Sequence, residues 1–294
     1  MKVGIYGQFY HKDSGKCIEE LLQILHKENI EVVIEKKFLE LIQHNETVVR
    51  EYDYLHTFKE LDSSYDLFFS IGGDGTILKS ISYIRDLNIP ILGINTGRLG
   101  FLATIQKDEI RKSISDILLK KYSISERTVL CIETSPENTD IGENNFALNE
   151  IAVSRKNTTS MITVETWLDD KYLTSYWADG LIVSTPTGST GYSLSCGGPV
   201  IVPNTNAMVI TPIAPHNLNA RPLVIKDDTK ITLKVSGRED FFLASMDSRI
   251  ASLHNTTEIT IKIAPFKISM VELQEDSFLQ TLRKKLLWGE DRRN

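Results

Sequence analysis

The chain has 294 residues, of which 41% are hydrophobic and 24% charged, and its formal net charge is −6 at pH 7. This length suffices for one large domain or two ordinary ones. The acidic balance argues against nucleic acid as the main partner, because proteins that bind it usually carry a basic face. No apolar stretch is long enough to span a bilayer, so we expect no membrane partner.

Three widely separated cysteines, Cys17, Cys131 and Cys196, fit neither a disulfide framework nor a zinc site. We interpret them as reduced thiols in the core of a cytoplasmic protein.

The first hundred residues alternate strand-like and helix-like patterns. We expect strands at 3–6, 32–34, 67–71 and 91–94, with helices near 14–25, 38–42 and 77–85. Such alternation predicts an α/β domain with a Rossmann-like, mainly parallel sheet, whose ligands bind at the carboxyl ends of the strands.

From Arg127 the pattern changes to short strands separated by turn residues, which predicts an all-β domain. The expected strands are 128–133, 147–154, 161–168, 181–184, 208–212, 230–235, 241–246 and 258–263. A helix at 107–119 is expected to link the domains, and one at 277–287 to return to the first domain. We therefore assign 1–108 with 266–294 to an α/β phosphate-binding domain, and 109–265 to a β-rich domain.

Residues 72–76, Gly-Gly-Asp-Gly-Thr, follow one predicted strand directly and open a helix. Glycines let the backbone approach a phosphate, and the N–H groups at a helix start attract anions. A carboxylate there repels phosphate, so we expect Asp74 to accept a proton from a hydroxyl that attacks a phosphoryl group. The alternative is a structural turn that Asp74 caps, with Thr76 as a helix-start residue. Three glycines around one aspartate favour a kinase.

Residues 178–199 form a second informative segment, in which small hydroxyl residues and glycines surround Tyr192. Such a loop can bond a flat polar ligand such as a nucleotide, with the tyrosine flanking a ring. The alternative is a glycine- and serine-rich β-loop without a ligand. The length and density of the segment favour the ligand.

Asn149 and Glu150 lie in a strand-like run. Because adjacent strand residues point to opposite faces, we expect one to face a ligand and the other to brace a loop. Arg98, His216 and Asp247 are weaker candidates, for which we favour structural or surface roles. Of these, Arg98 suits phosphate best, because it follows a strand and lies among glycines.

Together these segments resemble the NAD kinase family over nearly the whole chain. The 72–76 motif is shared with diacylglycerol and sphingosine kinases, and more loosely with phosphofructokinases. The Asn149-Glu150 pair and residues 179–199 are similar to NAD kinases in particular, and residues 215–223 also resemble that family. The resemblance implies transfer of the γ-phosphoryl group of ATP to the 2′-hydroxyl of the adenosine ribose of NAD, giving NADP and ADP.

The resemblance also implies roles for individual residues. Asp74 is the general base, and Gly75 and Lys79 help to form the dinucleotide site. Asn149 and Glu150 hold ribose hydroxyls or adenine-side groups. Asp179 contacts the nicotinamide side, or a neighbour's ligand across an oligomer interface. The other residues implied to bind NAD in the β-rich domain are Trp177, Thr190, Gly191, Tyr192, Ser193, Leu194, Ser195 and Ala214.

As cofactor, the resemblance implies a divalent cation such as Mg²⁺, held by the ATP phosphates and water rather than by a set of protein ligands. It further implies a homodimer or homotetramer. The chain departs from the family pattern at Trp177, where many bacterial members have Arg or Lys, and at Gly191, where Ala is common. Ser248 stands where Gly is often found.

Two other functions remain open. A lipid kinase would share the 72–76 motif, but the chain lacks the basic or amphipathic features that direct proteins to membranes. A non-catalytic NAD(P) sensor would not need the carboxylate of Asp74 beside the phosphates.

Overall fold

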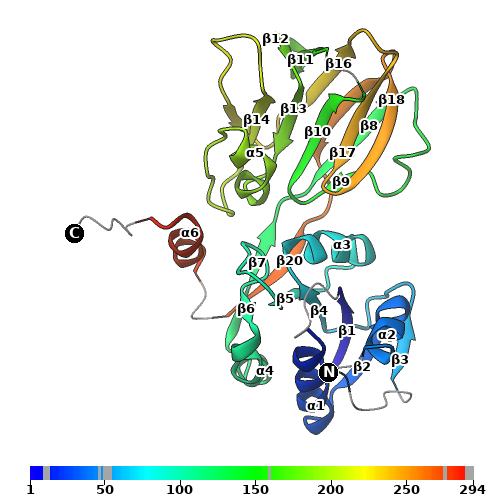
Figure 1. Ribbon diagram of the computed structural model, residues 1–294, viewed down its shortest axis with the longest axis vertical. Helices are drawn as coiled ribbons and strands as arrows, with labels where there is room; N and C mark the ends of the chain where they lie inside the picture. Colours follow the sequence, from blue (N-terminus) through cyan, green and yellow to red (C-terminus); the bar gives the residue numbers. More distant parts are fainter. Residues whose placement is uncertain (9–13, 46–47, 49–54, 158–159, 274–276, 289–294) are drawn as a thin grey trace. The chain divides into compact units, whose positions relative to one another are not determined.

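The computed structural model describes residues 1–8, 14–45, 48, 55–157, 160–273 and 277–288. The chain divides into two compact units, Met1–Glu126 with Ile268–Asn294, and Arg127–Lys267. Figure 1 shows the elements of each unit.

The first unit is built on one eight-stranded sheet with the order β3-β2-β1-β4-β5-β20-β7, in which β6 pairs with β5. Its elements are β1 (Lys2–Gly7), α1 (Ser14–Lys27), β2 (Glu31–Glu35), α2 (Lys36–Gln43), β3 (His56–Phe58), β4 (Leu67–Gly72), α3 (Asp74–Ile84), β5 (Ile91–Asn95), β6 (Ile105–Gln106), a 3₁₀ turn (Lys107–Glu109), α4 (Ile110–Leu118), β7 (Tyr122–Arg127), β20 (Ile268–Leu273) and α6 (Phe278–Leu286). The pairs β1–β2, β1–β4 and β4–β5 are parallel. The expected α/β fold with a mostly parallel sheet is confirmed.

The strand order reverses at β1, which pairs with β2 on one side and β4 on the other. In open parallel sheets, ligands bind beyond the carboxyl ends of the strands near such a reversal. The loops after β4 and β5 leave from this edge.

Two segments join the first sheet rather than the β-rich part. Helix α4, expected as a link between domains, buries Ile110, Ile114 and Ile117 in the same apolar cluster as α1. Strand β7 follows α4 and lies beside β20 in the sheet. The first compact unit therefore extends to Glu126, beyond the boundary we expect at residue 108.

The C-terminal part of the chain returns to the first unit. Strand β20, which the sequence pattern does not predict, pairs in parallel with β5. The α6 helix follows, and the Phe278 ring lies 6.4 Å from that of Phe101, between ring centroids. The predicted C-terminal helix is confirmed.

The second unit contains two six-stranded antiparallel sheets, with the orders β15-β14-β13-β10-β17-β18 and β12-β11-β16-β19-β8-β9. The strands are β8 (Leu130–Ser135), β9 (Phe146–Ala147), β10 (Glu150–Arg155), β11 (Ile162–Leu168), β12 (Lys171–Ala178), β13 (Gly180–Ser184), β14 (Ala207–Ile213), β15 (Leu223–Lys226), β16 (Ile231–Ser236), β17 (Phe241–Met246), β18 (Arg249–His254) and β19 (Glu258–Ile263). A 3₁₀ turn (Thr187–Thr190) and the short helix α5 (Tyr192–Ser195) interrupt them.

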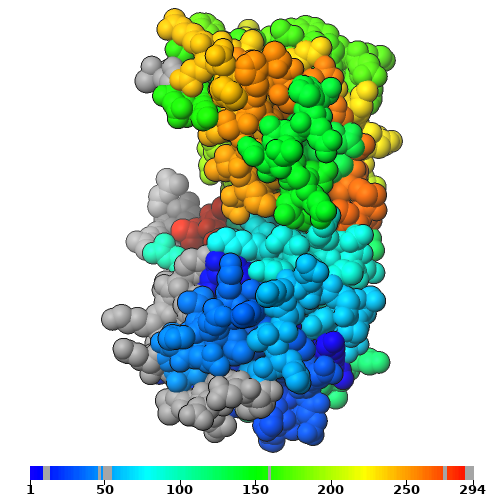
Figure 2. All heavy atoms as spheres, turned by 90° about the vertical axis from the view of Figure 1, so that its right-hand side faces the viewer, coloured from blue at the N-terminus to red at the C-terminus, as the bar shows by residue number. Residues whose placement is uncertain are grey.

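Alternate residues of both sheets meet in one apolar core. Ile151 and Val153 from β10 and Ile259 and Ile261 from β19 belong to the same buried cluster. Figure 2 shows the late strands of this unit (orange) lying beside its first segment (green), as the β19–β8 pairing requires. The predicted all-β C-terminal domain is confirmed.

Every helix in the described ranges is too short or too polar to cross a membrane.

Candidate functional site

The carboxyl ends of β4 and β5 border a small cavity in the first unit. Its volume is about 190 Å³, and its lining consists of Gly72, Gly73, Gly75, Thr76, Asn95, Thr96, Gly97 and Arg98. The two strands are parallel neighbours, and the N–H of Thr96 donates to the carbonyl oxygen of Gly72 at 3.2 Å. Glycine loops at a helix start expose N–H groups that bind anions, so this cavity suits a phosphate group.

Thr76 contributes a hydroxyl to the cavity lining. Its Oγ1 is buried and has no hydrogen-bond partner within the described residues. A Cβ at Gly72 would lie 2.2 Å from this oxygen, so a larger residue at 72 would displace Thr76. A buried hydroxyl without a partner costs free energy, which a bound oxygen would recover. Sequence reasoning assigns Thr76 only to the helix start and overlooks this hydroxyl.

Asp74 is the first residue of α3, and three backbone groups hold its carboxylate. Oδ1 accepts hydrogen bonds from the N–H groups of Leu102 and Ala103, each at 3.0 Å, and Oδ2 accepts one from Phe101 at 2.8 Å. These bonds join the glycine turn to residues 101–103. A negative charge at this end of α3 is also favourable to the helix dipole.

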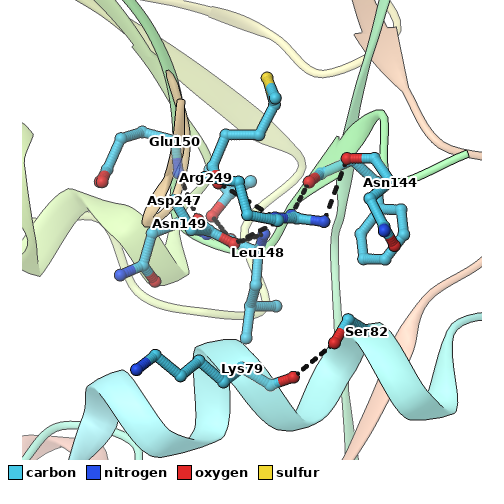
Figure 3. Close-up of polar contacts among 11 residues, drawn as sticks. Lys79, Ser82, Asn144, Leu148, Asn149, Glu150, Asp247 and Arg249 are labelled. Carbon is cyan, nitrogen blue, oxygen red and sulfur yellow. Dashed lines mark hydrogen bonds and ion pairs between the residues drawn. The ribbon is translucent and has the colours of Figure 1, made fainter. Parts of the chain in front are cut away.

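The other predicted residues of the first unit lie near Asp74 in the sequence. Gly75 and Lys79 are both exposed on α3, and Figure 3 shows the carbonyl of Lys79 accepting a hydrogen bond from Ser82, at 2.7 Å. Arg98 is exposed and borders the cavity, and its carbonyl oxygen accepts from Nδ2 of Asn95 at 2.6 Å.

In the second unit, Asn149 and Glu150 bring their side chains to the same place, contrary to our expectation of opposite faces. A Cβ at Gly191 would lie 3.1 Å from Oε2 of Glu150 and 3.4 Å from Nδ2 of Asn149. Figure 3 shows the two side chains extending to one side of the chain. The alternation rule fails here because β10 begins at Glu150, which leaves Asn149 outside the strand.

Both residues carry a buried oxygen that no other group satisfies. Oδ1 of Asn149 and Oε2 of Glu150 have no hydrogen-bond partner in the described part of the chain. Burial and, to a smaller extent, the charge of Asp247 raise the pKa of Glu150 from its usual 4.5 to about 7, although a hydrogen bond from the Tyr192 backbone lowers it. Hydroxyl or amide groups of a ligand could supply the missing donors.

The loop that follows β13 is packed onto this pair. Oγ1 of Thr185 donates to the carbonyl of Leu148 at 2.6 Å, and the Thr185 N–H donates to the carbonyl of Asn149 at 2.9 Å. At Gly188 a Cβ would lie 2.1 Å from that same Asn149 oxygen, so the close approach requires glycine. The rest of the loop is thereby fixed beside Asn149 and Glu150.

The predicted loop residues differ in exposure. Ser193 is buried and its Oγ lies 2.8 Å from Oγ1 of Thr211, whereas Tyr192 and Ser195 are exposed. Thr190 and Leu194 are half-buried. Burial, followed by the charges of Cys196, Asp179 and Glu150, raises the pKa of the Tyr192 phenol.

Trp177, Asp179 and Ala214 lie where β12 and β14 end and β13 begins. The Asp179 N–H donates to the carbonyl of Ile213, next to Ala214, whose φ of 43° is in the left-handed region. The Trp177 ring is 48% exposed, and its centroid lies 4.3 Å from that of His216.

Asp179 already has a cationic partner. Its carboxylate lies 3.0 Å from Nε of Arg155 and accepts from Nη2 of that residue at 3.3 Å. Any contact between Asp179 and a ligand would therefore share the carboxylate with this ion pair.

The structure also assigns a place to Asp247, for which the sequence favours only a structural or surface role. Its buried carboxylate accepts hydrogen bonds from the backbone N–H groups of Leu148, Asn149 and Glu150 (Figure 3). The sequence signal is an Asp-Ser pair between two strands, which is also what an ordinary turn looks like.

Within the described ranges, no three His, Cys, Asp or Glu side chains form a metal-binding group.

Two family models match the chain. The model of the ATP-NAD kinase N-terminal domain matches residues 3–122, and that of the ATP-NAD kinase C-terminal domain matches residues 148–273. The chain is 68% identical to the NAD kinase of Christiangramia forsetii and 56% identical to that of Flavobacterium psychrophilum, with all of each chain covered. It is 40% identical to the NAD kinase of Bacteroides fragilis, again over the full length of both.

Solved structures show the same fold. The chain is similar to yeast NADH kinase complexed with NADH, with a TM-score of 0.85 and 24% identity over 99% of this chain and 88% of that one. It is also similar to an NAD kinase from Archaeoglobus fulgidus in complex with ATP, with a TM-score of 0.75 and 24% identity over 98% and 99% of the two chains. With its full-length relatives and both family models in agreement, the chain belongs to the NAD kinase family.

Proposed function

We propose that this protein is an NAD kinase, which transfers the γ-phosphoryl group of ATP to the 2′-hydroxyl of the adenosine ribose of NAD. The observation that carries the proposal is the position of Asp74 at the start of α3, with its neighbours Gly73 and Gly75 lining a phosphate-sized cavity. A binding protein would not need a carboxylate there, whereas a phosphotransferase needs a proton acceptor.

In the proposed reaction, the ribose 2′-oxygen forms a bond to the γ-phosphorus while the bond from that phosphorus to the β-phosphate oxygen breaks. The proton of the 2′-hydroxyl passes to the carboxylate of Asp74, and ADP leaves. Three backbone hydrogen bonds hold this carboxylate in one orientation before the substrate arrives. Such fixed placement is a large part of catalysis in phosphoryl transfer.

The cavity lining would bind phosphate groups of the substrates through backbone N–H groups and the Thr76 hydroxyl. This lining has the chemistry of a phosphate site rather than of a metal site, and it fits a Mg²⁺ that arrives on the ATP phosphates and retains water ligands. The cation would offset the negative charge of the phosphates during transfer.

NAD would be recognised chiefly by the second unit. The unpartnered oxygens of Asn149 and Glu150 suit donors such as ribose hydroxyls or an amide, and the following loop offers the exposed Ser195 and the exposed Tyr192 ring. This many polar groups should favour an intact dinucleotide over adenosine.

We further propose a cytoplasmic homodimer or homotetramer. The cytoplasmic assignment is supported by the three cysteines, all of which are free thiols. The oligomer is proposed from the resemblance to the family.

The decisive test incubates the purified chain with Mg-ATP and NAD and measures NADP with an NADP-specific dehydrogenase. We expect NADP to accumulate, and NAD to be phosphorylated far better than adenosine. Phosphatidic acid from diacylglycerol, with no NADP, would establish a lipid kinase instead. A flat trace accompanied by calorimetric binding of NAD would establish a sensor. The same assay run with polyphosphate would define the phosphoryl donor.

A further inference from the structure

Asp247 occupies the two-residue turn between β17 and β18 and contacts the backbone that carries the Asn149–Glu150 pair. Oδ1 accepts from the N–H groups of Asn149 at 2.8 Å and Glu150 at 3.2 Å, and Oδ2 accepts from that of Leu148 at 2.9 Å. The N–H of Asp247 donates in turn to the carbonyl of Glu150 at 3.0 Å.

These contacts replace a strand partner that residues 148 and 149 lack. Strand β9 ends at Ala147 and β10 begins at Glu150, so Leu148 and Asn149 lie between the two strands and belong to neither. Buried backbone N–H groups need acceptors, and the Asp247 carboxylate provides them. The β10–β17 ladder, which runs from Ile151 paired with Met246 onward, does not include this contact.

The carboxylate is built into the core of the second unit. Its side chain is 1% exposed, which makes an ionised form costly without hydrogen bonds. Burial raises the pKa of Asp247, whereas the three N–H groups and the nearby Arg249 lower it.

Arg249 joins the turn to the segment before Leu148 (Figure 3). Its Nη2 lies 3.9 Å from Oδ2 of Asp247, and the guanidinium donates to the carbonyls of Asn144 and Phe146. The guanidinium carbon also lies 4.6 Å from the centroid of the Phe146 ring. Asp247 and Arg249 thus hold the chain at the Asn149–Glu150 pair and in the segment just before it.

We propose that Asp247 is a positioning residue for NAD binding: it fixes the backbone of residues 148–150 so that the Asn149 amide and the Glu150 carboxylate lie together beside Gly191. Each of these two side chains has one buried oxygen without a hydrogen-bond partner among the described residues. This inference rests on the proposed function. Asp247 acts through the pair and touches no substrate, so its loss should weaken NAD binding and spare the phosphoryl-transfer step.

The charge of Asp247 should also affect how KM for NAD depends on pH. The pKa of Glu150 is raised by burial and by the charge of Asp247 on the β17–β18 turn, and lowered by the Tyr192 N–H on α5. Arg249 on β18 acts on Asp247, whose pKa it lowers. Ionised Glu150 accepts ribose hydroxyls best, so KM for NAD should fall as pH rises through about 7. Without the Asp247 charge, the pKa of Glu150 falls and this transition moves to lower pH.

The test uses full-length Asp247→Asn, with Asp169→Asn as matched control. Asp169 also has a left-handed φ (48°) in a two-residue β-turn and accepts one backbone N–H, but it is exposed and outside the site. We expect Asp247→Asn to raise KM for NAD roughly tenfold at pH 7 and to leave kcat within about threefold. The pH transition should move down, whereas the control should match the wild type in all three values.

A second variant separates charge from position. Asp247→Glu keeps the charge but shifts the carboxylate by one methylene, so KM for NAD should rise while the pH transition stays near that of the wild type. If Asp247→Asn does not fold, the KM of Asp247→Glu still tests whether Asp247 is a positioning residue. Unchanged KM in the folded variants, or a loss confined to thermal stability, would overturn the positioning role.

Hydrogen exchange of the ligand-free chain keeps this inference separate from the proposed function. Amides 148–150 should exchange faster in Asp247→Asn than in the wild type or in Asp169→Asn, and equal rates would contradict the role of Asp247. If the wild type neither bound nor phosphorylated NAD, the proposed function would fail, and the exchange comparison would still decide whether Asp247 fixes this backbone.

Discussion

A Cβ built on Gly100 would lie 1.9 Å from Oδ1 of Asp74. No side chain fits at that distance, so the carboxylate proposed as the base occupies space that only glycine leaves open. Asp74 begins α3 and Gly100 lies in the loop after β5, and the N–H groups of residues 101–103 donate hydrogen bonds to the same carboxylate.

Gly100→Ala should therefore displace the Asp74 carboxylate and lower kcat for NADP formation roughly a hundredfold, because a misplacement of about 1 Å costs that much. The coupled assay measures kcat, and thermal unfolding checks the fold. Gly237→Ala is a suitable control, since Gly237 lies in an exposed turn and its nearest neighbour would be 3.2 Å from the new Cβ. A Gly100→Ala variant with wild-type kcat would mean that the Asp74 geometry is not required.

Glu150 should make stability depend on pH. The pKa of Glu150 is raised from its usual 4.5 to about 7 in the folded chain. Between pH 4.5 and 7, Glu150 is therefore ionised in the unfolded chain but still protonated in the folded chain. Stability is then lost as pH rises, by up to about 3 kcal/mol. Glutamine does not titrate, so the advantage of Glu150→Gln over the wild type should grow from pH 5 to pH 8.

Urea unfolding at the two pH values measures this difference, with exposed Glu28→Gln as the reference for removal of a surface charge. An advantage of Glu150→Gln that is the same at both pH values would show that the Glu150 carboxyl is not desolvated.

Trp177 stands where the family resemblance implies a cation. Its exposed ring lies beside that of His216, tilted by 50°, and brings no positive charge. Trp177→Arg should strengthen inhibition by NADP, since a guanidinium can pair with the added 2′-phosphate, and a roughly tenfold lower inhibition constant is expected. Trp177→Phe keeps an aromatic ring without charge and should behave as the wild type. Equal inhibition of the Arg and Phe variants would argue against a phosphate contact here.

The local patterns predict much of the first sheet because its strands are short apolar runs followed by turns. The runs at 3–6, 32–34, 67–71 and 91–94 are β1, β2, β4 and β5. Strand β20 could not be placed in the same way. Its partner β5 is far away in the sequence, and no local signal says which sheet a late strand joins. The pattern at 107–119 likewise predicts the helix that is α4, but only packing shows that it belongs with α1.

In the candidate site, too, the features that neighbouring residues encode are predicted and those that depend on distant contacts are not. Residues 72–76 are informative because glycines, a carboxylate and a helix start are adjacent in the chain, and the family resemblance that they support is confirmed. The roles of individual site residues stay predictions. The alternation rule separates Asn149 from Glu150 wrongly because it assumes a strand where the strand has not begun. The contacts of Asp247 cannot be predicted from local sequence, because its backbone partners lie 97 to 99 residues away.

The most direct measurement compares Asp74→Asn with the wild type at saturating NAD and Mg-ATP, with NAD binding followed by calorimetry. Loss of a general base typically costs about 10²- to 10⁴-fold in rate. We expect kcat for NADP formation to fall by at least a hundredfold, while the dissociation constant of NAD changes less than about threefold. Near-normal turnover in Asp74→Asn would remove Asp74 from the role of base and contradict the proposed mechanism.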